Sequence, residues 1–238
     1  MLKVILGSSP KTNFSAAQFK KKTEKIIADI LKRKKLPIVC GGTGFWIKAL
    51  VDNVIYPEVK PDWKLREKLG QKSAEELFDL LKIKDSRRAE NIDAKNSVRL
   101  IRALEICSAL GKVPVATSNQ DKYQFLQIGI ELPKEKLHQN IENRLKQRFD
   151  EGMIAEVEKL HREQKISWKK MESFGLGYLW IAKFLQKQLP REELFEKVYS
   201  AEKDYAKRQM TWFLKDQRIR WLENYPSIKK ATDDFLKK

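Results

Sequence analysis

A glycine-rich turn is the stretch whose residue types most directly suggest ligand binding. Gly41, Gly42 and Gly44 surround Thr43, directly after a short apolar run and before a helical pattern. Glycines let backbone N–H groups approach a ligand closely, and the start of a helix favours negative charge. Taken alone, the turn is more simply explained as a tight strand-to-helix connection. It is not a phosphate-binding P-loop, because the sequence contains no Gly-x-x-x-x-Gly-Lys-Ser/Thr.

A pair of arginines three residues apart forms a second candidate. Arg99 and Arg102 are expected to project together from a helix, and two forked guanidiniums can grip backbone phosphates. The alternative is a surface pair that bridges Glu105 or Asp93. Arg66 is a further candidate, for which a solvated helix face is the simpler explanation.

A third candidate, the segment Tyr205–Phe213, interleaves basic and aromatic side chains. Lys207, Arg208 and Thr211 would line one side of a helix, with Trp212 nearby. Cations that hold phosphates beside aromatic rings that stack on bases suit an RNA loop. The alternative is a core helix that uses its aromatics for packing. We expect both to hold, with the aromatic residues mostly buried.

The segment Met171–Tyr178 carries two glycines, Gly175 and Gly177, between helical patterns. It is explained either as a capped loop or as a place where a ligand approaches the backbone. His138 and His161 lie in polar helical patterns and are most simply surface residues. The sequence shows no nucleophile triad and no metal-binding set, so it offers phosphate and RNA contact without an obvious acid or base.

Composition bounds the class of protein. The chain has 238 residues, of which 42% are hydrophobic and 34% charged, with a formal net charge of +17. Such an excess suggests a polyanionic partner, because each neutralised phosphate releases counterions; a lysine-rich surface that serves solubility is the alternative. No apolar run is long enough to cross a membrane. Cys40 and Cys107 lie in apolar stretches and are expected to be buried thiols in a reducing, cytoplasmic compartment.

The elements around the glycine turn indicate an α/β layer. Ser15 and Gln18 form a capping box for a helix that runs to about Lys35. The apolar run Leu36–Cys40 is predicted to be a strand, and Met1–Leu6 a strand remnant. Helix, strand and helix in this order place a ligand site beyond the carboxyl end of the strand.

The rest of the chain separates into a helical insertion and a return to the core. Two prolines, Pro57 and Pro61, bracket a linker, and Asp62 caps the helix after it. Helices without any strand follow at Trp63–Gly70, Ala74–Leu81 and Val98–Leu110. The remaining predictions are a strand at Tyr123–Leu132, helices at Lys134–Phe149, Gly152–Arg162, Tyr178–Lys187 and Arg191–Asp216, a strand at Ile219–Leu222, and a frayed tail at Lys229–Lys238.

Four blocks of sequence together resemble the tRNA dimethylallyltransferase family, also called the tRNA isopentenyltransferases. They occur in the order of the family and span most of the chain, which makes the set far more specific than any one block. The blocks are FSAAQF at Phe14–Phe19, PIVCGGTGFWIKAL at Pro37–Leu50, VRLIRALEI at Val98–Ile106 and YAKRQMTWF at Tyr205–Phe213.

The resemblance implies an α/β fold with a P-loop NTPase-like parallel-sheet core, residues 1–56 and 120–238, and a helical insertion, residues 57–119, that contacts the anticodon stem-loop. It implies a monomeric enzyme that moves the dimethylallyl group of dimethylallyl diphosphate to N6 of the adenosine 3′ to the anticodon, with Mg²⁺ on the diphosphate. The target base would be flipped into a channel. Thr43 would contact that adenosine, and the tRNA-binding residues would be Arg66, Val98, Arg99, Leu100, Ile101, Arg102, Lys207, Arg208, Gln209, Thr211 and Trp212.

The chain also departs from the family pattern. The P-loop and the Asp that accepts the adenosine proton lie before the Phe14 block in the family, and neither motif occurs here. Glu172 and Leu176 replace residues that are usual beside Gly175. We therefore expect a chain without the N-terminal P-loop portion and inactive alone, through a truncated gene model or as a natural short form. A non-catalytic RNA-binding module is the alternative, and a small-molecule kinase relative a remote third.

Overall fold

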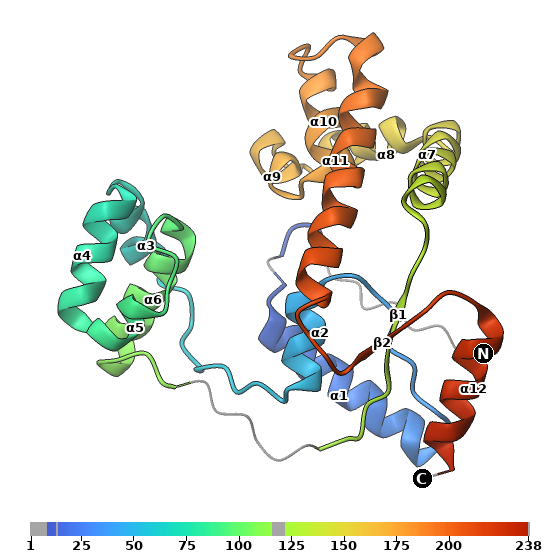
Figure 1. Ribbon diagram of the computed structural model, residues 1–238. Coiled ribbons are helices and arrows are strands. Elements are labelled where there is room, and N and C mark those ends of the chain that lie inside the picture. The colour runs from blue at the N-terminus through green and yellow to red at the C-terminus, as the bar shows by residue number, and fades with distance from the viewer. Residues whose placement is uncertain (1–8, 13, 116–121, 238) are drawn as a thin grey trace. The chain divides into compact units, whose positions relative to one another are not determined.

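The computed structural model describes residues 9–12, 14–115 and 122–237. They fall into two compact units, which we call the core unit (residues 1–51 and 123–238) and the insertion unit (residues 52–122), and each is described by itself. Figure 1 labels the elements. Their bounds are α1 Ala16–Lys32, α2 Gly44–Val51, α3 Trp63–Gly70, α4 Ala74–Lys84, α5 Ser86–Glu90, α6 Ser97–Leu110, β1 Gln127–Ile130, α7 Lys134–Asp150, α8 Met153–Arg162, α9 Trp168–Ser173, α10 Leu176–Leu185, α11 Arg191–Phe213, β2 Ile219–Leu222 and α12 Tyr225–Leu236.

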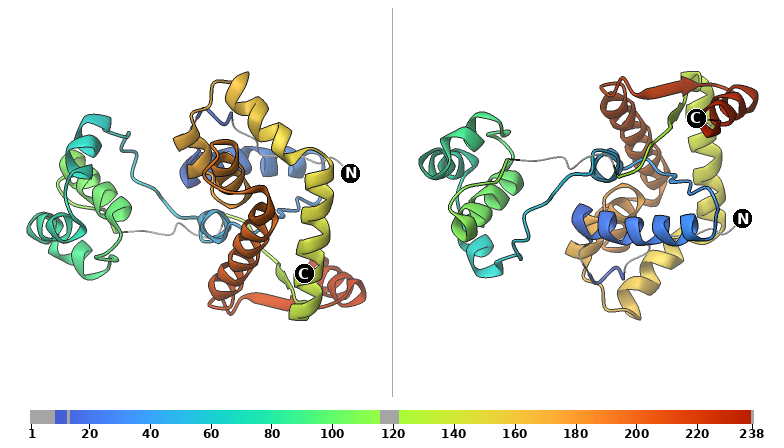
Figure 2. Two further views of the ribbon diagram at one scale, coloured as in Figure 1. Left: turned by 90° about the horizontal axis from the view of Figure 1, so that it is seen from above. Right: turned by 90° about the horizontal axis from the view of Figure 1, so that it is seen from below.

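The largest hydrophobic cluster of the core unit joins α7 to α11. Leu145 of α7, Val157 of α8, Ile181 of α10 and Val198 of α11 are all fully buried in it. The long helix α11 lies directly against α10 in the views from the front, above and below (Figures 1 and 2). This packing anchors the first half of α11, so that its second half is held in place over the glycine turn.

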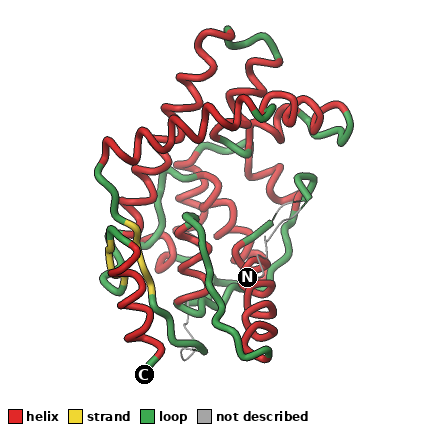
Figure 3. Tube along the Cα trace, turned by 90° about the vertical axis from the view of Figure 1, so that its right-hand side faces the viewer, coloured by secondary structure: helices red, strands yellow, loops and turns green. Residues whose placement is uncertain are grey.

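Two short strands form a parallel sheet within the described part of the chain. Gln127 of β1 lies opposite Ile219 of β2, and Ile130 lies opposite Leu222. Figure 3 shows the strands side by side in yellow. The crossover between them consists of α7 to α11, which a parallel connection requires. The prediction of a strand at Ile219–Leu222 is confirmed, and the protein is mostly helical with this small parallel sheet.

The segment Leu36–Cys40 is not a strand, although its apolar sequence predicts one. It has no regular secondary structure and pairs with no strand among the described residues, with Ile38 77% exposed. A strand requires a neighbour that satisfies its backbone groups, and a local pattern cannot provide that neighbour. Cys40 is therefore exposed, contrary to the prediction, whereas Cys107 is buried as expected.

Helix α1 begins as its sequence predicts. The Ser15 hydroxyl accepts the Gln18 N–H, and the Gln18 side chain accepts the Ser15 N–H, which completes the capping box. The helix ends at Lys32, because the chain turns through Lys34 with a positive φ of 54°. Its buried face meets α2 where the Phe19 and Trp46 rings stack at 5.0 Å.

The insertion unit is helical throughout its regular elements, α3 to α6. Leu77 and Leu81 of α4 and Leu100 of α6 are fully buried and form the centre of its own hydrophobic cluster. As predicted, the Asp62 carboxylate caps α3 by accepting the Leu65 N–H at 3.0 Å. The unit thus has both a core and capped helices of its own.

Two further predictions were wrong. Residues Tyr225–Leu236 form α12, so the tail from Lys229 is not frayed. His161 is half-buried, because its ring stacks on Trp168 at 3.7 Å and its Nδ1 lies 2.7 Å from the Ile166 carbonyl. His138 is partly exposed on α7, which agrees with a position at the surface. In the described residues no helix has the length and apolarity needed to cross a membrane. The remnant strand predicted at Met1–Leu6 lies outside the described residues.

Candidate RNA-binding site

The glycine turn packs directly against α11. A Cβ atom on Gly42 would come within 2.6 Å of the Gln209 side chain, and one on Gly44 would overlap the ring of Trp212. At Gly44 only glycine allows this approach, because the indole ring is rigid, whereas at Gly42 the flexible end of Gln209 can shift; a Cβ on Gly41 would meet nothing within 4 Å. Two sequence blocks more than 150 residues apart are thereby brought into one site.

Thr43 forms the junction between the turn and α2. Its carbonyl accepts the N–H groups of Trp46 at 2.9 Å and Ile47 at 3.1 Å, which begins the helix. The Thr43 side chain is exposed. Its hydroxyl can both donate and accept a hydrogen bond, so it can meet a polar edge such as that of a nucleobase.

An open pocket of about 570 Å³ lies beside this turn, between α2, the start of β1 and the end of α11. Two aromatic residues and three cations contribute to its wall, a combination that can stack on a base and hold a phosphate. Its lining residues are Gly44, Ile47, Lys48, Gln127, Trp212, Phe213, Lys215, Asp216, Gln217 and Arg218.

Asp216 is the one carboxylate among the lining residues described, and it is engaged in an ion pair. Arg218 binds it through Nε at 2.8 Å and through Nη2 at 2.7 Å. The hydrogen bonds from Arg218 lower the pKa of Asp216 below its ordinary value. A carboxylate that is stabilised in its charged form is a poor proton acceptor, so Asp216 is better suited to holding Arg218 in place.

The basic residues of α11 lie on the exposed side of the helix, as their spacing predicts. Lys207 and Arg208 are exposed, and the Arg208 guanidinium lies 5.6 Å from the centre of the Tyr205 ring. The Thr211 hydroxyl donates to the Lys207 carbonyl at 3.0 Å. Trp212 is 42% exposed and is therefore less buried than expected. These side chains are available to a partner.

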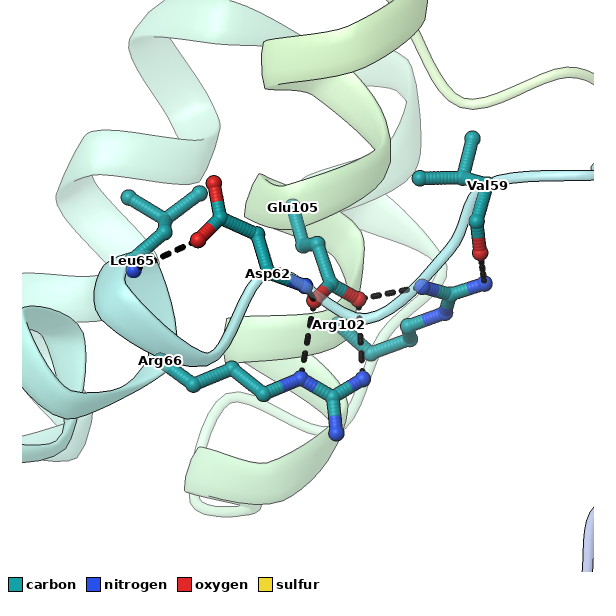
Figure 4. Close-up of polar contacts among 6 residues, drawn as sticks. All are labelled: Val59, Asp62, Leu65, Arg66, Arg102 and Glu105. Carbon is teal, nitrogen blue, oxygen red and sulfur yellow. Dashed lines mark hydrogen bonds and ion pairs between the residues drawn. The ribbon is translucent and has the colours of Figure 1, made fainter.

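In the insertion unit, the two arginines of α6 have different roles. Arg102 is half-buried: it pairs with Glu105, and its Nη2 donates to the Val59 carbonyl at 2.9 Å (Figure 4). Arg99 is exposed. The two do not project together from the helix surface, and the alternative interpretation, an arginine that bridges Glu105, describes Arg102.

Arg66 belongs to the same cluster and is not a solvated surface residue. Its Nε and Nη2 donate to the two Glu105 carboxylate oxygens, each at 2.8 Å. Glu105 also accepts the Asp62 N–H at 2.6 Å and is only 1% exposed. Burial raises the pKa of Glu105, but the hydrogen bonds from Arg66, Arg102 and the Asp62 N–H outweigh it and lower the pKa to about 2. We call these four residues the Glu105 cluster.

The rest of the block on α6 is divided between core and surface. Val98 is 79% exposed, Leu100 is fully buried and Ile101 is half-buried. Leu100 therefore supports the helix from inside the unit. In the core unit, Gly175 has a positive φ of 73° directly before α10, and a Cβ there would meet nothing within 4 Å.

Comparison with known proteins decides which family this site belongs to. Residues 4–216 match the family described as IPP transferase, which is most of the chain. The chain belongs to the IPP transferase family. A tRNA dimethylallyltransferase from Acetivibrio thermocellus is 36% identical over 224 residues, 90% of this chain and 71% of the relative. The tRNA dimethylallyltransferase 1 of Geotalea uraniireducens is 34% identical over 96% of this chain and 76% of its own length.

Solved structures of IPP transferases resemble this chain in three dimensions. The tRNA isopentenylpyrophosphate transferase of Bacillus halodurans is 26% identical, with a TM-score of 0.63 over 96% of this chain and 75% of that one. The enzyme from Staphylococcus epidermidis is 28% identical, with a TM-score of 0.62 over 96% of this chain and 78% of that one. A eukaryotic dimethylallyltransferase acting on tRNA is 23% identical. It shares the fold, with a TM-score of 0.73 over 91% of this chain and 58% of that one.

The described residues do not match the donor set of the Mg²⁺ expected from the resemblance. No three His, Cys, Asp or Glu side chains among them lie close enough together to hold a metal ion. Asp216 is paired with Arg218, and Glu105 is enclosed by Arg66 and Arg102. We therefore assign no step of the chemistry to a metal bound by these residues.

Several pocket residues escaped prediction from the sequence of this IPP transferase. Lys48 lies one helical turn after Gly44, and Lys215, Gln217 and Arg218 directly follow the aromatic block on α11. A signal existed for these four, since Lys48 lies within the block Pro37–Leu50 and the other three closely follow the block that ends at Phe213. Gln127 at the start of β1 offered no such signal, because only the fold brings it to the pocket.

Proposed function

We propose that this chain positions the anticodon stem-loop of a tRNA for transfer of a dimethylallyl group from dimethylallyl diphosphate. The acceptor is N6 of the adenosine 3′ to the anticodon. In the reaction the N6–C bond forms, the bond from the allylic carbon to the diphosphate oxygen breaks, and N6 loses a proton. The observation that carries the proposal is the contact of Gly42 and Gly44 with Gln209 and Trp212, beside a cationic and aromatic pocket, in a member of this family.

The residues of the pocket contribute binding and orientation. The exposed Thr43 hydroxyl hydrogen-bonds the polar edge of the adenine, and Trp212 offers an aromatic face beside it. Lys48, Lys215 and Arg218 attract the flanking phosphates. Correct placement of the nucleophilic nitrogen is itself a large part of such a displacement, because a positioned nucleophile reacts as an effectively unimolecular one.

The charge of the chain favours the core unit as the main contact for the RNA backbone. The core unit, residues 1–51 and 123–238, carries 35 Lys+Arg and 20 Asp+Glu. The insertion unit, residues 52–122, carries 14 Lys+Arg and 12 Asp+Glu. The stretch 16–35 on and after α1 contains eight basic and two acidic residues. In the insertion unit two arginines, Arg66 and Arg102, are bound to Glu105, so Arg99 is the better candidate for a phosphate contact.

We further propose that the two units correspond to a P-loop NTPase-like core and an anticodon-binding insertion. The exposed apolar segment Leu36–Cys40 is consistent with a strand of a larger sheet. No P-loop motif occurs in the 238 residues. The diphosphate cradle, its Mg²⁺ and the base that accepts the N6 proton are therefore not assigned to them, and these residues alone are expected to bind tRNA without catalysing transfer.

Two measurements on the 238-residue chain test the proposal. Binding to tRNA should weaken steeply with salt, since phosphates are neutralised on binding. Mass spectrometry of the tRNA after incubation with dimethylallyl diphosphate and Mg²⁺ should show no added dimethylallyl group. Turnover by the chain would overturn the assignment of the diphosphate cradle to residues outside it, and failure to bind tRNA would overturn the proposed function.

A non-catalytic RNA-binding module is the second candidate, favoured by the absence of the P-loop motif. The two candidates differ in what Thr43 does. If the pocket holds the target adenosine, Thr43→Val should weaken binding to the tRNA bearing that adenosine and leave binding to its guanosine variant unchanged. A module that grips only the RNA backbone would bind both tRNAs equally, with or without Thr43.

A further inference from the structure

Trp63 is an unusually exposed aromatic residue on the insertion unit. It is the first residue of α3, follows the capping residue Asp62, and is 61% exposed. Large aromatic side chains are normally buried, and they are enriched on surfaces where a partner covers them. The hydrophobic cluster of the unit does not include Trp63, so the fold of the unit gives no reason for an indole at this place.

The indole is held by a fixed cation. The Arg66 guanidinium carbon lies 5.1 Å from the centre of the Trp63 ring. Arg66 cannot move away easily, because it donates two hydrogen bonds to Glu105, which is only 1% exposed. A ring supported in this way keeps its orientation before a ligand arrives, which lowers the entropic cost of binding to it.

The charged groups near Trp63 define the chemistry of its partner. The Glu105 carboxylate is paired with two arginines, and the Asp62 carboxylate, which keeps its charge, is engaged as the helix cap by the Leu65 N–H. Lys60 and Lys64, on either side in the sequence, are exposed. A flat aromatic face among available cations suits an unpaired nucleobase and its phosphate better than an apolar protein surface.

We propose that Trp63, supported by Arg66, is a stacking platform for an unpaired base of the RNA substrate. The proposal rests on the proposed function, since it assumes that the insertion unit meets RNA. It adds a binding residue outside the sequence blocks shared with the family. The platform contributes stacking and no charge, so it should change the affinity without changing the salt dependence.

The test compares Trp63→Ala, Trp63→Phe and Trp63→Leu with Ile83→Ala, a control at a position of the same unit that is 84% exposed. The probes are the tRNA, an anticodon stem-loop hairpin and a fully paired duplex of equal length. Trp63→Ala should weaken hairpin binding about tenfold, as expected for the loss of one stacked base. Trp63→Phe should retain most of the affinity for the hairpin, whereas Trp63→Leu should not. In all three variants the slope of log affinity against log salt and the affinity for the duplex should stay unchanged.

The failures are distinguishable. If the unaltered chain binds no tRNA, the proposed function fails. If the chain binds tRNA but Trp63→Ala equals Ile83→Ala, or Trp63→Leu equals Trp63→Phe, the stacking platform fails while the proposed function stands. If Trp63→Ala weakens binding to the paired duplex as much as binding to the hairpin, the stacking platform is also wrong. If sedimentation shows that the chain self-associates and Trp63→Ala abolishes this, the exposed indole is a protein contact and the proposal is wrong. Thermal unfolding checks that each variant is folded.

Discussion

The two units each contain a buried glutamate between two arginines, but the surroundings of the two differ. In the insertion unit Glu105 is 1% exposed, and its arginine side chains are 31% and 35% exposed. In the core unit Glu202 of α11 is 7% exposed, and binds Arg144 at 2.6 Å and Arg148 at 3.0 Å, whose side chains are 63% and 36% exposed. One glutamate and two arginines therefore form a closed cluster in the insertion unit and a more open one in the core unit.

The difference shows that the number of ion pairs in a cluster does not determine how much the cluster contributes to the stability of its unit. Arg66 binds Glu105 through two parallel hydrogen bonds, and the Asp62 N–H adds a third donor. Each arginine of Glu202 makes a single contact from a helix surface. Exposed pairs are weak because water screens them, whereas removing one member of a buried pair leaves an uncompensated charge. We expect the Glu105 cluster to hold its unit together and the Glu202 pairs to be accessory.

The largest effect is expected from Glu105→Gln. The change leaves Arg66 and Arg102 without their carboxylate and should destabilise the insertion unit by about 3 kcal/mol. The matched change, Glu202→Gln, should cost about 1 kcal/mol, since Arg144 is largely exposed to solvent and each arginine makes a single hydrogen bond to Glu202. Amide hydrogen exchange followed by mass spectrometry reports α3 to α6 separately from α7 to α11. Equal losses of protection in the two variants would contradict the comparison.

Acid should loosen the insertion unit through the same carboxylate. The pKa of Glu105 is lowered from 4.5 to about 2 in the folded chain, so its stabilisation is complete above about pH 4.5 and disappears as the pH falls to 2. The loss should approach about 3 kcal/mol. Denaturant unfolding monitored by circular dichroism between pH 5 and 2 measures it. Glu105→Gln should remove most of this pH dependence, and an unchanged slope would show that other carboxylates dominate.

Gly44→Ala tests the packed side of the core unit, where contact rather than charge holds the elements. The new Cβ would overlap the Trp212 ring, so α2 and α11 must move apart at a cost of about 1–3 kcal/mol. The control Gly41→Ala should be tolerated, since nothing lies within 4 Å. Thermal unfolding measures stability, and tRNA affinity should fall for Gly44→Ala alone. Similar behaviour of both variants would mean that the turn does not depend on its contact with α11.

The smallest change in free energy is expected from removing lysine charges, which compares the contribution of the two units to phosphate binding. Neutralising Lys21, Lys25 and Lys32 of α1, all exposed, should reduce the slope of log affinity for tRNA against log salt by about 2–3. The control removes three exposed lysines of the insertion unit, Lys82, Lys84 and Lys95, and should leave the slope nearly unchanged. A larger change in the control would place the main phosphate contacts on the insertion unit instead.

Local patterns were predictable where neighbours in sequence decide the structure. The capping box at Ser15 and the cap at Asp62 follow from residues within a few positions of one another. The strand Ile219–Leu222 was also predicted from its own residues, but it forms only because β1 lies beside it. Predictions failed where a distant partner decides. Leu36–Cys40 lacks a neighbouring strand among the described residues, and Arg66 is drawn out of solvent by a glutamate 39 residues away.

The sequence by itself determined the family, because four ordered blocks of residues carry it, and most of the helices, because capping and apolar spacing are local. Only the tertiary structure decided which charged and aromatic groups remain available. It placed Gly42 and Gly44 against α11, enclosed Arg66 and Arg102 around Glu105, and left Trp63 exposed. The physical reason is that burial and ion pairing depend on residues far apart in the chain, which no local pattern contains.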